Sequence, residues 1–188
     1  MPWILNENYR RRSHKERPEW IVVHYPGCPG ASAEAVITSL MNSSRRCSTH
    51  FAVDEFNVAR GVDVRYAAFH CGGRSESRNG CYNGNAIGVD LCDEKFDKRS
   101  KKASDNDWYI KPLTLERGAA LIANLMREYG IDINHVCRHY DVTGKLCPSP
   151  MVGKDRRSYN YPDKSCEDVW LDFKQKILQA YRRYGNVS

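Results

Sequence analysis

The sequence predicts an α/β fold in which a central mixed β-sheet is flanked by helices. Residues 19–25 and 86–92 are continuous apolar runs, which are typical of short strands buried on both faces. Amphipathic segments with helix-capping residues lie between and after these runs. Strands that alternate with helices predict a sheet whose faces are covered by helices. The length of 188 residues is sufficient for one domain with a sizeable core.

The first strand places a histidine at a position suited to a functional site. Residues 1–17 are polar and basic without periodicity, so we expect an N-terminal extension followed by one domain of residues 18–188. The apolar run of residues 19–25 ends at Pro26 and Gly27. His24 therefore lies at the carboxyl end of a buried strand, where open α/β sheets carry their sites.

The middle of the chain predicts a helix and three further strands. Ser32 caps a helix that runs to about residue 44. Short strands are expected at residues 49–54 and 58–66, and a buried strand at residues 86–92. The polar stretch of residues 93–112 is long for a connection, which is typical of a functional wall or a mobile segment.

Two amphipathic helices are expected in the C-terminal half. Thr114 caps the first helix and Gly130 closes it, and residues 131–139 return as a strand. Ser165 and Asp168 have the spacing of a capping box, with Asp in place of Glu or Gln. The two apolar stripes are Leu115, Ile122, Leu125, Met126 and Tyr129, and then Val169, Trp170, Phe173, Ile177 and Tyr181.

Residues 139–150 hold the strongest chemical signal in the chain. They read H-Y-D-V-T-G-K-L-C-P-S-P and bring together His139, Lys145 and Cys147 within nine residues. Imidazole and thiolate are the side-chain groups that Zn²⁺ prefers. The glycine and the two prolines indicate a turn-rich loop, and such loops often carry active-site groups.

This segment resembles the C-terminal zinc motif of the N-acetylmuramoyl-L-alanine amidases, a family that includes phage lysozyme-amidases and peptidoglycan recognition proteins. Four more segments match family signatures in the same order, so the resemblance spans roughly residues 20–150. They are I-V-V-H-Y at residues 21–25, S-T-H-F at 48–51, F-H-C-G at 69–72 and N-A-I-G-V-D-L at 85–91. The resemblance implies the family's mixed sheet flanked by helices.

The resemblance also implies one Zn²⁺ per chain, bound by His24, His139 and Cys147. Three protein ligands leave the fourth tetrahedral position to water, as in catalytic sites. Lys145 is then expected to stabilise the oxyanion of the reaction. Asp90 is the candidate general base, because several relatives have a catalytic glutamate at this position.

Several assignments stay open at this stage. Asp90 could instead accept backbone hydrogen bonds or orient a zinc histidine. Thr49 stands where some relatives have a catalytic tyrosine, and threonine cannot replace a phenol. Thr49, His50 and His70 are candidate substrate-binding residues, although structural roles for the histidines are nearly as well supported.

Two residues compete with the proposed ligands. His135 is four residues from His139, which would place both on one face of a helix, but Gly130 has already ended the helix and His135 is expected at the surface. Cys137 would share a face with His139 on a strand and competes with Cys147.

The eight cysteines leave the redox compartment open. If Cys147 binds metal, seven remain, so they cannot all pair within one chain. Most are expected to be small buried hydrophobes. Cys71 and Cys81 flank a glycine-rich loop and are the favoured disulfide pair.

Charge and hydropathy bear on partners and location. The net charge is +6, with basic runs at residues 10–12 and 98–102. These form a solvated surface or attract a polyanion, for which the cell wall fits better than nucleic acid, since no nucleic-acid-binding motif is present. The sequence contains no run of eighteen apolar residues, so no membrane span is predicted. Residues 1–5 are too short for the apolar part of a signal peptide, so reaching an extracellular target requires another route, release by lysis or a leader already removed.

The sequence therefore predicts a zinc hydrolase of endolysin or autolysin type. We expect it to cut the amide bond between N-acetylmuramic acid and L-alanine in bacterial peptidoglycan. The alternative is a peptidoglycan-binding receptor of the same fold without catalysis. Non-catalytic relatives typically lose the cysteine ligand, and Cys147 is present here.

Overall fold

The computed structural model describes residues 8–185, and it confirms the predicted mixed sheet flanked by helices. The main sheet has five strands in the order β4-β3-β6-β2-β9. The strands are β2 (Trp20–His24), β3 (Phe51–Val53), β4 (Val58–Arg60), β6 (Ala86–Leu91) and β9 (Val136–Arg138). Two-stranded pairs are formed by β1 (Tyr9–Arg11) with β5 (Tyr66–Ala68), and by β7 (Glu94–Lys95) with β8 (Trp108–Tyr109).

Strand β2 occupies an interior position, next to β6 on one side and β9 on the other, and it is parallel to both. Strand β3 is also parallel to β6, and only β4 runs antiparallel to its neighbour. The register of β2 and β6 pairs His24 with Asp90. Because the carboxyl ends of parallel strands meet at one edge of a sheet, the residues that follow β2 and β9 lie close together there.

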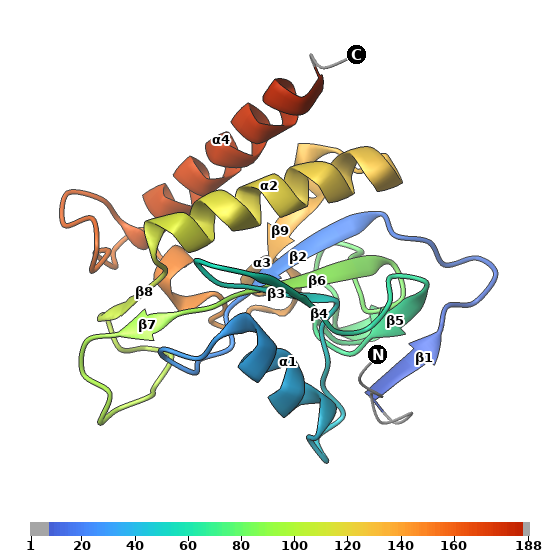
Figure 1. Cartoon of the computed structure of the whole chain (residues 1–188), viewed down its shortest axis with the longest axis horizontal. Helices are drawn as coiled ribbons and strands as arrows, with labels where there is room; N and C mark the ends of the chain where they lie inside the picture. The colour runs from blue at the N-terminus through green and yellow to red at the C-terminus, as the bar shows by residue number, and fades with distance from the viewer. Residues whose placement is uncertain (1–7, 186–188) are drawn as a thin grey trace.

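The sheet is covered on both faces (Figure 1). The long helices α2 (Pro112–Tyr129) and α4 (Cys166–Gly185) lie on one face, and α1 (Ala33–Met41) lies on the other. The short α3 (His139–Thr143) follows β9 directly. Further short elements are the 3₁₀ helices η2 (Arg74–Glu76), η3 (Ile133–His135) and η4 (Ser149–Met151).

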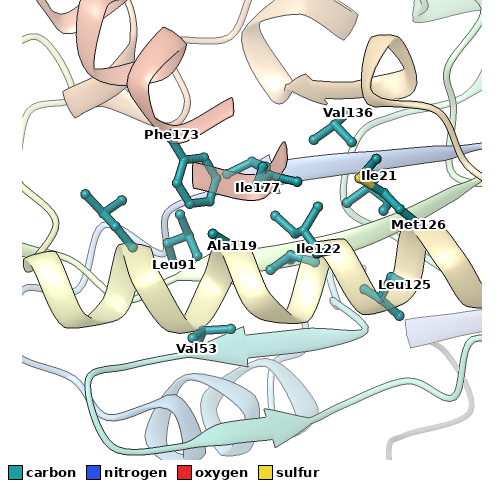
Figure 2. Close-up of a cluster of buried hydrophobic side chains, with 14 of the residues drawn as sticks. Ile21, Val53, Leu91, Ala119, Ile122, Leu125, Met126, Val136, Phe173 and Ile177 are labelled. Atoms are coloured by element: carbon teal, nitrogen blue, oxygen red, sulfur yellow. The ribbon is translucent and has the colours of Figure 1, made fainter. Parts of the chain in front are cut away.

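The main core lies between the sheet and the pair α2 and α4 (Figure 2). Ile122 of α2 and Phe173 and Ile177 of α4 are almost completely buried against Ile21 and Leu91 of the sheet. This packing holds the strands of the main sheet, and so supports the edge where the candidate site lies.

Three predicted helix ends are confirmed. The Ser32 hydroxyl accepts a hydrogen bond from the Ala35 amide at the start of α1, and Gly130 ends α2 in the left-handed conformation. Ser165 and Asp168 form the predicted reciprocal capping box before α4, with Asp168 Oδ2 accepting from the Ser165 amide at 2.8 Å.

Other element boundaries differ from the prediction. Helix α2 begins at Pro112 instead of being capped by Thr114, because proline suits the first turn of a helix and Thr114 is buried within that turn. The expected strand of residues 58–66 splits into β4 and β5, because Asp63 forms a turn with Arg65. The strand expected at 131–139 is shorter, since Asp132 caps the 3₁₀ helix η3.

Part of the predicted N-terminal extension packs against the domain and pairs with one of its strands. Its described part contributes β1, which pairs with β5. The Arg12 guanidinium donates hydrogen bonds to the backbone carbonyls of Val64 (3.1 Å), Gly84 (2.5 Å) and Ala86 (3.0 Å). Arg12 is therefore a structural residue of the domain, although it belongs to the basic run expected at the surface. Residues 1–5, considered above for a signal peptide, lie outside the described residues.

The long polar stretch of residues 93–112 forms the β7–β8 hairpin. The buried ammonium of Lys95 makes ion pairs with Asp105 (3.2 Å) and Asp107 inside the hairpin.

Over residues 8–185, none of the helices offers an apolar stretch of the length that crossing a bilayer requires.

Candidate metal centre

Three segments bring His24, His139 and Cys147 to the carboxyl edge of the sheet. His24 is the last residue of β2, and His139 follows β9 as the first residue of α3. Cys147 lies in the loop after α3, which folds back so that the Tyr140 amide donates to the Cys147 carbonyl at 2.9 Å. All three side chains are buried.

The donor atoms of these residues have the spacing of metal ligands. One ligand atom from each of the three lies within 4.8 Å of the other two. His24 Nδ1 is 3.7 Å from Cys147 Sγ. A thiolate and an imidazole bound tetrahedrally to zinc are separated by about 3.5 Å, given Zn–S near 2.3 Å and Zn–N near 2.0 Å. His139 Nδ1 is buried and has no hydrogen-bond partner, which fits a ligand atom.

The electrostatics favour neutral imidazoles and a protonated thiol before a cation binds. Burial, followed by the charges of His70, His139 and Lys145, holds the pKa of His24 well below its usual value. Burial and then the Lys145 charge lower the pKa of His139 to about 4. Burial raises the pKa of Cys147 to about 12. A cation that binds here meets two free imidazole lone pairs and displaces the thiol proton.

Asp90 lies beside this donor set, on β6. Its side chain is buried, and burial raises its pKa to about 6, although the Thr49 hydroxyl and the Lys145 ammonium act in the opposite direction. A carboxylate with this pKa is largely ionised at neutral pH and still able to accept a proton. The position is compatible with the expected general base.

The donor set opens into a cleft of about 630 Å³. His24, His70, Asp90, His139 and Cys147 line its inner part. The exposed Lys145 also lines the cleft. The outer wall is formed by Ser39 and Leu40 of α1 with Arg45 and Cys47 beyond it.

The three candidate substrate-binding residues have different positions. His50 is completely buried, its Nδ1 accepts from the Gly88 amide at 2.9 Å, and its Nε2 lies 3.1 Å from the Tyr66 carbonyl. Both ring nitrogens are therefore used within the fold. Thr49 is also buried. His70 is among the residues that line the cleft, and Thr49 and His50 are not.

The competing ligands lie away from the donor set. Cys137 is buried in a cluster with Cys71 and Cys81, and its thiol is outside the His24–His139–Cys147 group. His135 is exposed and packs edge-on against Trp20, as expected for a surface residue. Cys71 and Cys81 are free thiols, so the favoured disulfide is absent from the structure.

Two supporting residues were not anticipated from the sequence. Asp93 is almost completely buried and its Oδ1 accepts from the amides of Gly27 (2.9 Å) and Cys28 (3.3 Å), which fixes the turn after His24. Arg138 pairs with Asp141 (2.8 Å) and Glu167 (2.7 Å), which anchors the start of α3 to α4. An acidic residue directly after a buried strand, and a basic residue next to a candidate ligand, are the signals that could have indicated them.

Comparisons with known proteins show the family of this chain. Residues 14–150 match the family described as N-acetylmuramoyl-L-alanine amidase. The chain is 32% identical over 145 residues to the N-acetylmuramoyl-L-alanine amidase CwlL of Bacillus licheniformis, covering 70% of this chain and 36% of that protein. It is 31% identical over 172 residues to CwlA of Bacillus subtilis (strain 168), covering 92% of this chain and 53% of that amidase.

The fold comparison gives the same result. The solution structure of the PlyG catalytic domain superposes with a TM-score of 0.65 at 24% identity, covering 91% of this chain and 87% of that domain. At this identity the likeness concerns the fold alone. The family match covers most of the chain, including the two histidines and the cysteine that meet at the sheet edge. This protein therefore belongs to the N-acetylmuramoyl-L-alanine amidase family.

Proposed function

We propose that this protein is a zinc-dependent amidase that hydrolyses the bond between N-acetylmuramic acid and L-alanine in bacterial peptidoglycan. The observation that carries the proposal is the convergence of His24 Nδ1 and Cys147 Sγ, 3.7 Å apart, with His139 in a cleft that Asp90 and Lys145 also line. The curated relatives, named for this activity, support the choice of substrate. As a relative of these amidases, the protein would act as an endolysin or an autolysin.

His24, His139 and Cys147 would hold one Zn²⁺. Two neutral imidazoles and one thiolate form a donor set typical of zinc, with fewer than four protein ligands as in catalytic sites. When bound there, the ion supplies Lewis acidity toward an amide carbonyl and toward water. The fit is supported by the unpartnered Nδ1 of His139 and by the spacing of the donors.

Asp90 is assigned the role of general base. Its pKa of about 6 leaves it ionised at neutral pH, so it can take the proton of the attacking water. Its position in β6 is fixed by pairing with β2 on one side and β3 on the other. Such fixed placement favours proton transfer, because the carboxylate need not be reoriented during the reaction.

Lys145 is assigned the stabilisation of the oxyanion. Its ammonium lies close enough to lower the pKa values of His24, His139 and Asp90, so its charge acts on the centre of the cleft. A positive charge at this point favours the negative oxygen that develops when water attacks an amide carbonyl. The exposed position leaves room for the substrate to enter first.

The nature of the products tests the proposal. Purified cell walls are digested with the zinc-loaded protein, and with Cys147→Ser as the matched control. An amidase releases new amino groups of L-alanine and no reducing sugar ends, and the control variant is expected to be inactive. Reducing ends without new amino groups would rule out the proposed amidase activity. Wall binding without either product, in the presence of zinc, would favour the non-catalytic receptor.

A further inference from the structure

The two ring nitrogens of His24 face different partners. Nδ1 lies toward the donor set, 3.7 Å from Cys147 Sγ, and Nε2 lies 2.9 Å from Nδ1 of His70. If Nδ1 presents its lone pair to a cation, the ring proton must be on Nε2. That proton can only be donated to the lone pair of His70 Nδ1. The contact therefore requires one tautomer of each ring.

His70 is held in place by two separate features. Its backbone amide donates to Asn83 Oδ1 at 2.9 Å, and the Cys71 amide donates to the same oxygen at 2.8 Å. The ring lies against β6 at Gly88, where a Cβ atom would come within 2.9 Å of His70 Cγ and 3.0 Å of Nδ1. Glycine at this position in the middle of a buried strand leaves space for the ring.

A direct contact of His70 with substrate fits less well. His70 lines the cleft, but its Nδ1 is engaged with His24 and its Nε2 is buried from solvent. Neither nitrogen is available to a sugar or peptide that enters the cleft. The ring offers the substrate only carbon atoms.

We propose that His70 is a positioning residue that accepts the Nε2 proton of His24 and so keeps the His24 Nδ1 lone pair directed at the metal. This inference rests on the proposed zinc site. Metal-binding histidines usually donate their second N–H to a carboxylate, a carbonyl or water. A neutral imidazole as acceptor fixes the orientation of His24 without adding negative charge, so the centre keeps more of its positive charge.

The test compares two replacements of His70. Asparagine carries an amide oxygen near the position of Nδ1 and can still accept the proton, whereas leucine fills the space without an acceptor. Zinc affinity is measured by competition with a chromophoric chelator, and melting temperature is recorded on the same samples. We expect His70→Leu to bind zinc about 10–100-fold more weakly, the usual effect of losing such a partner, and His70→Asn to stay close to the parent.

Gly88→Ala provides an independent variant. Its new Cβ would press on the His70 ring and, at 3.0 Å, on Thr49 Oγ1, so we expect weaker zinc binding with His70 itself unchanged. Gly73→Ala is the matched control, because a Cβ there meets only Glu76 Oε2 at 3.7 Å, an ordinary contact. If His70→Leu fails to fold, His70→Asn and Gly88→Ala still carry the comparison.

The Michaelis constant for a defined muropeptide, measured at saturating zinc, separates positioning from substrate contact. We expect it to be unchanged in His70→Leu. Parent-like zinc affinity in both His70→Leu and Gly88→Ala would overturn the inference, as would a raised Michaelis constant with unchanged zinc affinity. If the parent itself binds no zinc, the proposed function fails first, so the two failures are distinguishable.

Discussion

Asp90 is an acidic side chain in the interior of a buried strand, a position where an unpaired charge is costly. Burial raises its pKa to about 6. In a purely structural role, a carboxylate would gain more from backbone donors that hold it ionised. An aspartate placed beside a cleft with a pKa near neutrality suits proton transfer.

The variant Asp90→Asn tests that role. It keeps the shape of the side chain and removes the proton acceptor, so we expect turnover to fall by roughly 10²–10⁴. Zinc content is expected to stay near that of the parent and the melting temperature not to fall, and Asp90→Glu to keep much of the activity. Because an ionised base is required, the rate of the parent should rise as pH increases through about 6. A fully active Asp90→Asn protein would refute the assignment.

The two cysteines near His139 make a matched pair for the metal site. Cys147 Sγ faces His24, whereas Cys137 is buried among Cys71 and Cys81. We therefore expect Cys147→Ser to lose most of its zinc and Cys137→Ser to retain one zinc per chain, as measured by elemental analysis. The opposite result would make Cys137 the ligand.

At the residue scale, chemical type and order along the chain were enough to indicate which side chains come together. His24, His139, Cys147, Asp90 and Lys145 do line one cleft, although their roles stay predictions. The sequence could not separate His50 from His70. Both histidines belong to family motifs. Only the tertiary structure shows that the two ring nitrogens of His50 bond to backbone groups.

At the scale of elements, α4 depends on a few large side chains. Phe173 is almost completely buried between α4 and the sheet, while Leu171 on the same helix is 53% exposed. Phe173→Ala is expected to lower the free energy of unfolding by about 3–5 kcal/mol, because it leaves a cavity in the core. Leu171→Ala should change it by less than about 0.5 kcal/mol. Urea denaturation of both variants measures the difference, and equal effects would contradict the packing described here.

Apolar periodicity predicted the long elements well and the short ones poorly. The stripes of α2 and α4 repeat over many turns, and most of their members are buried, although Tyr181 is 38% exposed and lies under Arg127. Strands of three residues such as β4, β5 and β9 carry too little pattern to show where they end. Their ends depend on local side chains such as Asp63 and Asp132, which turn the backbone.

At the scale of the whole molecule, the order of strands in the sheet could not be predicted from the sequence. Strand β6 lies between β2 and β3, which precede it in the chain, and β9 pairs with β2 from the far end of the sequence. Such pairings depend on contacts between distant segments. The clustering of the five motifs anticipated their meeting but not the register that places Asp90 beside His24.

The buried carboxylates make stability depend on pH. Burial raises the pKa of Asp90 to about 6 and that of Asp93 to about 7, both from 3.8. The folded state therefore binds these protons more tightly than the unfolded state. Their stabilising contribution is greatest below about pH 4 and is lost as pH rises through 6 and 7.

Asp93→Asn isolates one of these groups. Asparagine keeps an oxygen to accept from the Gly27 and Cys28 amides and cannot ionise. In the presence of chelator, we expect the melting temperature of the variant to rise relative to that of the parent as pH increases from 5 to 8. One kcal/mol corresponds to about 2–4 °C for a domain of this size. A difference independent of pH would show that Asp93 does not titrate between pH 5 and pH 8 in the folded state.

The hydrogen bonds of Arg12 bear on how this domain can be shortened. The family match begins at residue 14, but the guanidinium two residues earlier satisfies carbonyls from two separate segments, one before β5 and one that leads into β6. One of them belongs to Ala86, the first residue of the strand that carries Gly88 and Asp90. A chain trimmed to the family boundary would leave those carbonyls without their donor and lose the β1–β5 pairing. Truncated variants made for crystallisation or fusion should therefore retain the chain from residue 8 onward.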